Sequence, residues 1–429
     1  MKKIIHIMGG NYTSRYYTDS DKPVIDDPFI TLNTEFPPYR LHYHTGHHHV
    51  RVALKISEIS SEYKHECWHP EILADRIYQK NIQGLKFKLF PMKPPKTIKL
   101  KKNHIISKAF SRDLINELKK EVKKGNVLVH LHGFPGGHNE LILKHMSLDS
   151  IPLIVQHRGG SFKFEKYGLM NNNFKNKILS YLHRFYTYNI GKKYYRDVDY
   201  FFSNTKAEYQ TLKKLGFENI KLHKDGVDFN SFNILDKKKA REKLDLPVDK
   251  KTVIYIGRFY KEKGVDKIID AFNNLKSSID INLILVGGSK SDDLYQAALD
   301  SGAKVVPRVP NSELVKYIQA ADLSVAIYSN YIVKFGGFGR STLEAFACGV
   351  PFISQNLIHF IGSKKELKEL GIIPQSLKID ELESCIKEIL NNPECYLKCR
   401  ETAKKYYDFD VTVKQNLSVY SHCFKQYSN

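Results

Sequence analysis

The chain has 429 residues, is 42% hydrophobic and carries a formal net charge of +21 at pH 7. This length exceeds what one ordinary hydrophobic core supports, so we expect two domains. The apolar content excludes a disordered chain, and no apolar run reaches the ~18 residues that a membrane span needs. Most of the positive charge lies in the first 200 residues. A generally lysine-rich surface would explain part of it, but the asymmetry predicts an anionic partner for that half.

The first ten residues combine two lysines with a short apolar run, a pattern that signal peptides share. This run is too short for a signal peptide, and Gly9 and Gly10 follow it directly, so we expect a buried strand over Ile4–Met8. The six cysteines are scattered without zinc-ribbon spacing. Unpaired cysteines fit a reducing cytoplasm.

The rest of the first half predicts alternating strands and helices. Further strands are expected at His49–Ser57, Asn126–Leu131, Ile151–His157 and Tyr200–Ser203, the last leading into a helix that begins after Asn204. Continuous apolar strands separated by helical stretches indicate a parallel sheet. Glycines and polar residues follow the strands' carboxyl ends, where open α/β sheets bind ligands.

A second alternating series begins after a charged segment that contains Pro247. Its expected strands are Val253–Ile256, Ile281–Val286, Lys304–Val306 and Leu323–Ala326, with a helix that ends near Leu275. We therefore expect a hinge near 225 and two domains, residues 1–225 and residues 226–410. An amphipathic helix at about 411–429 is expected to pack back on the first domain.

The stretch from Lys163 to Arg196 interleaves aromatic residues with lysines and arginines. Basic amphipathic helices that are rich in aromatic residues lie on anionic membrane surfaces. The alternative is that part of this apolar content packs on the sheet. We expect contact with an anionic membrane surface.

Two glycine-rich stretches in the second half carry groups that bind phosphate. Gly257-Arg258 and Lys263-Gly264 lie between a strand and a helix, where Arg258 offers a planar fork and Lys263 a point charge. About eighty residues on, a glycine-rich turn runs from Gly336 into a short apolar helix that carries Glu344. Solvated surface charge is the alternative, but the position after a strand end, beside glycines, favours phosphate binding.

These motifs resemble the donor-binding half of glycosyltransferase family 4, and their order and spacing fit over residues 250–352. The matching stretches are Ile256-Gly257-Arg258-Phe259, Glu262-Lys263-Gly264-Val265, Leu285-Val286-Gly287-Gly288, Ala321-Asp322-Leu323 and Leu343-Glu344-Ala345 through Val350-Pro351. The resemblance implies a GT-B fold, which has two facing Rossmann-like domains with parallel sheets and an interdomain cleft. It also implies a nucleotide-sugar donor, retention at the anomeric carbon and no required metal or other cofactor.

The resemblance also assigns roles to residues. Arg258 and Lys263 would hold the diphosphate as catalytic groups, and Glu344 would accept hydrogen bonds from the ribose. His157 would face the donor sugar as a third catalytic candidate. The donor would also lie near a further set: Gly257, Arg308, Gly336, Gly337, Phe338, Gly339 and Arg340. The acceptor side would include Gly9, Gly10, His132 and Arg158.

One position departs from the family, which usually has two acids with seven residues between them. Glu344 is at the second position, but Gly336 is at the first. No Asp or Glu lies between Asp322 and Glu344, so a register shift does not supply the missing acid. Because that acid usually contacts the sugar hydroxyls, we expect either a different anchor, such as Lys334, or weak or unusual activity.

A run of histidines offers a metal hypothesis that we weigh against a polar loop. The run comprises His42, His44, His47, His48 and His49, with no cysteine among them and acids only at a distance in sequence. Because the family needs no metal, we expect a polar loop near the acceptor and no metal site.

The favoured hypothesis is a retaining glycosyltransferase of the hexosyltransferase type that acts on a lipid-linked or cell-surface glycan acceptor at the cytoplasmic membrane face. A sugar-nucleotide epimerase on the same fold and a catalytically impaired GT-B subunit are the alternatives. A basic nucleic-acid binder is a further hypothesis. No aromatic-basic surface module of a known type is evident, so we expect no nucleic acid partner.

Overall fold

The computed structural model describes residues 1–8, 48–71, 74, 76–91, 111–133, 139, 142–143, 151–157, 165, 174–189, 191–223, 225–309, 311–328 and 330–427. The chain divides into two compact domains. The first comprises residues 1–223 and 413–429, and the second comprises residues 224–412. The first domain therefore includes most of the C-terminal helix, and the chain crosses between the domains close to the expected hinge.

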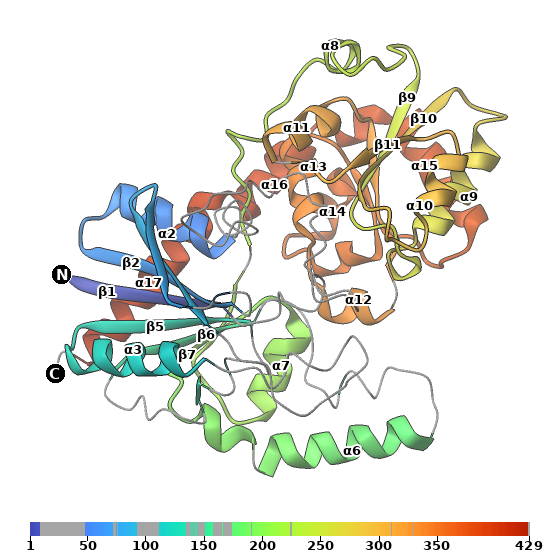
Figure 1. The fold of residues 1–429 in the computed structure, drawn as a ribbon. Helices are drawn as coiled ribbons and strands as arrows, with labels where there is room; N and C mark the ends of the chain where they lie inside the picture. The colour runs from blue at the N-terminus through green and yellow to red at the C-terminus, as the bar shows by residue number, and fades with distance from the viewer. Residues whose placement is uncertain are drawn as a thin grey trace. The chain divides into compact units, whose positions relative to one another are not determined.

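The first domain consists of one sheet with helices on its faces (Figure 1). Its elements are β1 (Lys2–Met8), α2 (His48–Ile59), β2 (Tyr63–Glu71), β3 (Tyr78–Ile82), β4 (Leu85–Pro91), α3 (Arg112–Lys123), β5 (Val127–His132), β6 (Leu153–Gln156), α6 (Phe174–Asn189), η3 (Gly191–Tyr195), β7 (Tyr200–Ser203), α7 (Lys206–Lys214), β8 (Ile220–Leu222) and α17 (Phe409–Gln426). The strands expected near residues 4, 126, 151 and 200 are confirmed as β1, β5, β6 and β7.

The eight strands of this sheet lie in the order β3-β4-β2-β1-β5-β6-β7-β8. All neighbouring pairs are parallel except the edge pair β3–β4, so the expectation of parallel strands fails only at that edge. The order reverses direction between β1 and β5. The carboxyl ends of strands at such a switch point are where open α/β sheets bind ligands.

Histidines line one face of this sheet around the switch point. His6 of β1 is paired in register with Cys67 on one side and with His130 on the other. Since registered residues of parallel strands share a face, five histidines point to the same side: His6, His65, His69, His130 and His132. Helices α2 and α17 cover this side, because His49 and Tyr420 contact the histidine rings.

The strand expected at His49–Ser57 is wrong, because this segment forms the helix α2. Its buried residues recur at helical spacing, at His49, Val50, Val52, Ala53 and Ile56. Lys55 and Glu58 also form an ion pair one helical turn apart. The valines favoured a strand by composition, but the burial pattern follows a helix that packs on the sheet.

The second domain is a smaller sheet with its own hydrophobic core. Its elements are α8 (Lys237–Glu242), β9 (Lys251–Ile256), η4 (Lys261–Lys263), α9 (Val265–Leu275), β10 (Ile281–Gly288), α10 (Tyr295–Asp300), β11 (Lys304–Pro307), α11 (Asn311–Gln319), β12 (Leu323–Val325), α12 (Asn330–Phe335), α13 (Arg340–Ala347), β13 (Phe352–Ile353), η5 (Gln355–His359), α14 (Lys364–Leu370), β14 (Gly371–Ile372), α15 (Ile379–Asn391), η6 (Pro393–Tyr396) and α16 (Cys399–Tyr407).

The second sheet has the order β11-β10-β9-β12-β13-β14, with all pairs parallel. This is the strand order of a doubly wound dinucleotide-binding sheet. The four strands expected in this half are confirmed as β9, β10, β11 and β12. The switch point lies between β9 and β12, so the loops that follow these two strands meet at one place.

Candidate functional site

The loop after β9 brings Arg258 and Lys263 to the switch point of the second sheet. Gly257 has a φ of 156°, and a Cβ there would lie 2.6 Å from the Tyr255 hydroxyl oxygen. Gly264 has a φ of 65°, and its Cβ would collide with the carbonyl oxygen of Ile327, just after β12. Both positions therefore require glycine, and they fix the path of the loop between them.

Lys263 lies over the ring of Tyr328, whose hydroxyl is near the start of helix α13. Its Nζ is 4.9 Å from the ring centroid of Tyr328. A Cβ at Gly339 would lie 3.6 Å from the Tyr328 hydroxyl oxygen and 3.7 Å from Oγ of Ser341, so both hydroxyls lie at the start of α13. Burial raises the pKa of Tyr328 to about 12, so this hydroxyl keeps its proton at neutral pH. The lysine charge is thereby held beside the N-terminal turn of α13, which itself favours anions.

Arg258 is positioned by the loop that follows β10. Its guanidinium stacks 4.7 Å from the ring centroid of Tyr260. Burial and the charge of the nearby Asp292 carboxylate raise the pKa of Tyr260. The same carboxylate accepts backbone N–H bonds from Phe259 at 2.9 Å and Ser289 at 3.2 Å. Asp292 thus joins the loops after β9 and β10 into one surface.

The glycine-rich turn before α13 is held from η5. The Asn356 amide donates a hydrogen bond to the Gly337 carbonyl oxygen at 2.7 Å, and Gly337 has a φ of 59°. Glu344 lies one turn into α13 and is 5% exposed. Its Oε1 is 4.0 Å from Nε of Arg340, which is an exposed residue at the helix start. A buried carboxylate beside a cation at a helix start is suited to polar recognition of a hydroxyl-bearing ligand.

Gly336 closes helix α12, and its backbone leaves no room for a side chain. Its N–H donates a hydrogen bond to the Ile332 carbonyl oxygen at 2.7 Å. A Cβ at Gly336 would lie 2.5 Å from that oxygen and 3.1 Å from Cγ2 of Ile332. An acid at this position would therefore require the end of α12 to shift. The backbone at the end of α12 therefore suits glycine, and an acid could not take its place without a change in that backbone.

The remaining donor-side candidates lie around this surface. Phe338 is half-buried and packs against the rings of Phe346 and Tyr407. Gly339 precedes α13 as its N-cap. Arg308 follows β11 and is exposed, two strands away from β9 in the sheet.

In the first domain, His157 lies against a buried carboxylate. Its Nδ1 lies 2.5 Å from Oε1 of Glu208, and both side chains are almost completely buried. Glu208 also completes the capping box of α7 with Thr205, so the same carboxylate orients the imidazole and begins the helix. Gly9, Gly10 and Arg158, the other acceptor-side candidates with His132, lie outside the described residues.

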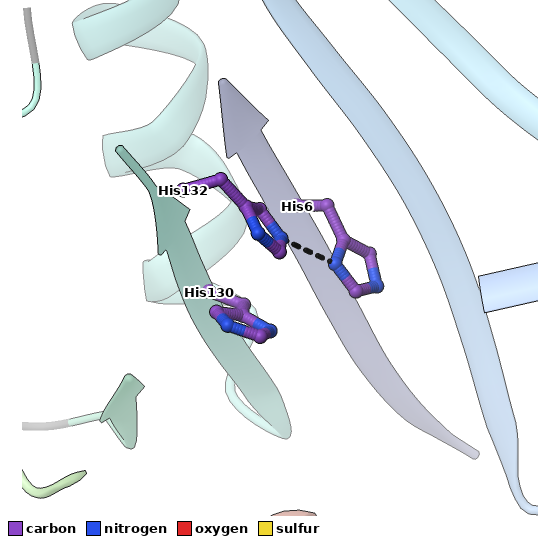
Figure 2. Close-up of side chains that lie close together, drawn as sticks. All are labelled: His6, His130 and His132. Atoms are coloured by element: carbon purple, nitrogen blue, oxygen red, sulfur yellow. Dashed lines mark hydrogen bonds between the residues drawn. The ribbon is translucent and has the colours of Figure 1, made fainter. Parts of the chain in front are cut away.

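His132 belongs to the buried histidine layer of the first sheet. Its Nε2 lies 3.0 Å from Nδ1 of His6 (Figure 2). Nε2 of His6 in turn lies 2.9 Å from Nδ1 of His65. Burial lowers the pKa of His65 to about 3, so this imidazole is neutral at physiological pH. His49 of the histidine run packs on this layer, whereas His42, His44 and His47 lie outside the described residues.

Several residues of these sites were not predicted from the sequence. Asp292 and Tyr328 follow the strands β10 and β12 closely, and their position after strand ends was a usable signal. His65 and His69 lie an even number of residues apart in one strand, as do His130 and His132 in another. This spacing was the signal that the histidines of each strand share a face.

The family comparison covers the second domain most completely. Residues 236–406 match the family described as glycosyl transferases group 1. An uncharacterized glycosyltransferase of Methanocaldococcus jannaschii is 26% identical over 290 residues, which cover 64% of this chain and 68% of that protein. TuaC of Bacillus subtilis, a glycosyltransferase named for teichuronic acid biosynthesis, is 30% identical over 34% of this chain. That match covers 36% of TuaC, so the aligned part spans about a third of its length.

Solved structures resemble the chain over nearly its full length. Sucrose-phosphate synthase from Thermosynechococcus elongatus has a TM-score of 0.66 at 13% identity, covering 99% of this chain and 100% of its own. Anabaena HepE in complex with UDP-glucose has a TM-score of 0.61 at 14% identity, covering 98% and 100%. These likenesses show the GT-B fold. The family match over residues 236–406 and the named relatives support glycosyltransferase activity.

Replacing Asp292 with alanine tests how the surface is positioned. The substitution leaves the N–H groups of Phe259 and Ser289 without their acceptor. We expect a loss of about 1–3 kcal/mol in the free energy of unfolding. Binding of a nucleoside diphosphate should weaken in parallel, measured by calorimetric titration. The control is Asp293→Ala, because Asp293 is the exposed neighbour. Equal stability and affinity in the two variants would contradict the positioning role.

Proposed function

We propose that the chain transfers a sugar from a nucleotide-diphosphate donor to a lipid-linked or cell-surface glycan acceptor. The observation that carries the proposal is the convergence of two cations and a helix start at the switch point of the second sheet. Lys263 lies over the ring of Tyr328, whose hydroxyl is near Ser341 at the start of α13. Arg258 stacks on the ring of Tyr260, near Asp292 of the next loop. HepE, which has the same fold, is known in complex with UDP-glucose, and this supports a nucleotide-sugar donor.

The proposed mechanism is that of the retaining family 4 enzymes. Arg258 and Lys263 neutralise the charge that develops on the diphosphate as its bond to the anomeric carbon breaks. The acceptor hydroxyl forms the new glycosidic bond from the same face, and its proton passes to the departing phosphate oxygen. This route uses no metal or other cofactor. His157, oriented by Glu208, would face the donor sugar.

The nucleotide and the sugar are held by different parts of the turn at 336–344. Glu344 accepts hydrogen bonds from the ribose hydroxyls, and the backbone N–H groups of Phe338, Gly339 and Arg340 approach the phosphate and the sugar. At Gly336 the sugar meets backbone alone, because a Cβ has no room there. The exposed Lys334, two residues earlier on α12, is the proposed side-chain anchor for the sugar.

The family match and the named relatives favour transfer over epimerisation or an inactive subunit. The chain retains Arg258, Lys263 and Glu344 at the positions that match the family's donor-binding motifs. This agrees with an active enzyme.

Substitution of the two cations tests the transfer hypothesis. Arg258→Ala and Lys263→Ala should each lower kcat by roughly 100- to 1,000-fold, because each removes a charge that stabilises the leaving diphosphate. The assay follows release of nucleoside diphosphate from a panel of radiolabelled nucleotide sugars, with membrane lipid extract as acceptor. Lys261→Ala is the matched control, because Lys261 is exposed in the same loop. Full turnover in both test variants would refute the role assigned to this loop.

Helix α6 supports the proposed membrane partner, an anionic surface at the cytoplasmic face. The described part of the 163–196 segment exposes an apolar stripe on α6, where Phe174, Ile178, Tyr181, Leu182 and Phe185 are between 43% and 79% exposed. These spacings place them on one side of the helix. Lys175, Lys177 and Arg184 flank the stripe, and Lys192 and Lys193 follow in η3. No helix among the described residues is both long and apolar enough to cross a membrane.

Vesicle flotation tests this partner. The wild-type protein should float with phosphatidylglycerol vesicles and only weakly with phosphatidylcholine, because both apolar burial and charge contribute. The triple variant Phe174→Ser, Tyr181→Ser, Phe185→Ser should bind at least ~10-fold more weakly, since it removes the largest exposed side chains.

Leu397→Ser is the control, because Leu397 is 81% exposed in the second domain and outside the stripe. Random RNA should give no gel shift at physiological salt. Equal flotation of the triple variant and the control, or tighter binding to RNA than to vesicles, would overturn the proposed membrane partner.

A further inference from the structure

Three imidazoles meet on the two strands that flank the switch point of the first sheet. His6 comes from β1, and His130 and His132 come from β5 (Figure 2). One ring nitrogen of each lies within 4.8 Å of one nitrogen of each of the others. All three side chains are at most 2% exposed. Among the described residues this is the one group of histidines, cysteines and acids that could hold a metal ion.

The outer nitrogens of these rings have defined partners. Nε2 of His6 lies 2.9 Å from Nδ1 of His65, and Nδ1 of His130 lies 2.9 Å from the Tyr420 hydroxyl. The Tyr420 hydroxyl in turn donates to Oδ1 of Asn416 at 3.3 Å. Metal-binding histidines are oriented in this way, by a hydrogen bond from the ring nitrogen that does not bind the metal. This assigns Nδ1 of His6 and Nε2 of His130 to the centre of the group.

We propose that His6, His130 and His132 bind a divalent transition-metal ion of the Zn²⁺ type, at a site separate from the donor surface. The pair distance agrees with this chemistry. Nδ1 of His6 and Nε2 of His132 are 3.0 Å apart. Two nitrogens bound at ~2.0 Å in a tetrahedron would be about 3.3 Å apart, so this pair needs only a small movement. The ligand atoms of all three residues lie within 4.8 Å of one another, so His130 would move closer on binding.

The chemistry of the ligands selects the class of ion. Three neutral imidazoles suit Zn²⁺ and its first-row neighbours, whereas Mg²⁺ and Ca²⁺ require oxygen ligands. Three protein ligands leave a fourth position for water or hydroxide. A hydroxide there would offset part of the positive charge, which is costly to bury.

The position of the group gives the ion a structural role. His132 is the last residue of β5, so one ligand reaches the carboxyl edge of the sheet. The ion would join β1 to β5, and through His130 and Tyr420 it would join the sheet to α17, which comes from the far end of the chain. Binding would therefore stabilise the first domain without taking part in glycosyl transfer.

Metal analysis of the wild-type protein is the first test. The protein is purified without a histidine tag, and its metal content is measured by plasma mass spectrometry. It is then stripped with dipicolinate and titrated with Zn²⁺ and Co²⁺. We expect about one ion per chain, a Co²⁺ spectrum of tetrahedral type, and a melting temperature that falls on stripping and recovers with Zn²⁺ but not with Mg²⁺.

Variants assign the ion to the three histidines. His6→Gln and His132→Gln should each weaken Zn²⁺ binding by at least ~100-fold. His422→Gln is the control, because His422 is an exposed histidine of α17 in the same domain, and it should bind as the wild type does. Absence of Zn²⁺ and Co²⁺ binding by the wild-type protein, which needs no variant to fold, would overturn the proposal. So would binding of unchanged affinity in the two test variants.

Discussion

The packing of Gly264 against the carbonyl of Ile327 is the contact on which the donor side of this protein depends. It brings the loop after β9 against the chain that leaves β12, at the one place where the sheet reverses its strand order. Lys263, which precedes Gly264, is thereby held over the ring of Tyr328. The Tyr328 hydroxyl is near Ser341 at the start of α13. The proposed phosphate-binding surface thus depends on a steric condition that only glycine satisfies.

Gly336 is subject to a second steric condition. The end of α12 brings the Ile332 carbonyl so near that no side chain fits at residue 336 in this backbone. In the proposed site, sugar recognition therefore uses neighbouring groups, whereas Glu344 lies buried on a separate helix.

Much of the fold could be predicted from the sequence, because the buried parallel strands are continuous apolar runs with glycines after them. Strand β2 was missed because it carries Lys64 and Glu66. Glu66 is buried nonetheless, since Lys3 lies 3.2 Å away and Trp68 donates to it. Arg258, Lys263 and Glu344 could be identified from local motifs. Asp292, Tyr328 and the histidine layer were not identified, although Asp292 and Tyr328 follow strand ends closely, because each acts through a contact with a residue distant in sequence.

The central claim is that the switch point of the second sheet holds a diphosphate, and calorimetric titration tests it most directly. Wild-type protein is titrated with UDP, GDP and ADP, and with the corresponding monophosphates. Charge-assisted hydrogen bonds from Arg258 and Lys263 to the second phosphate should make the preferred diphosphate bind roughly 10- to 100-fold more tightly than its monophosphate. Equal affinities for diphosphate and monophosphate across all three bases would contradict the account.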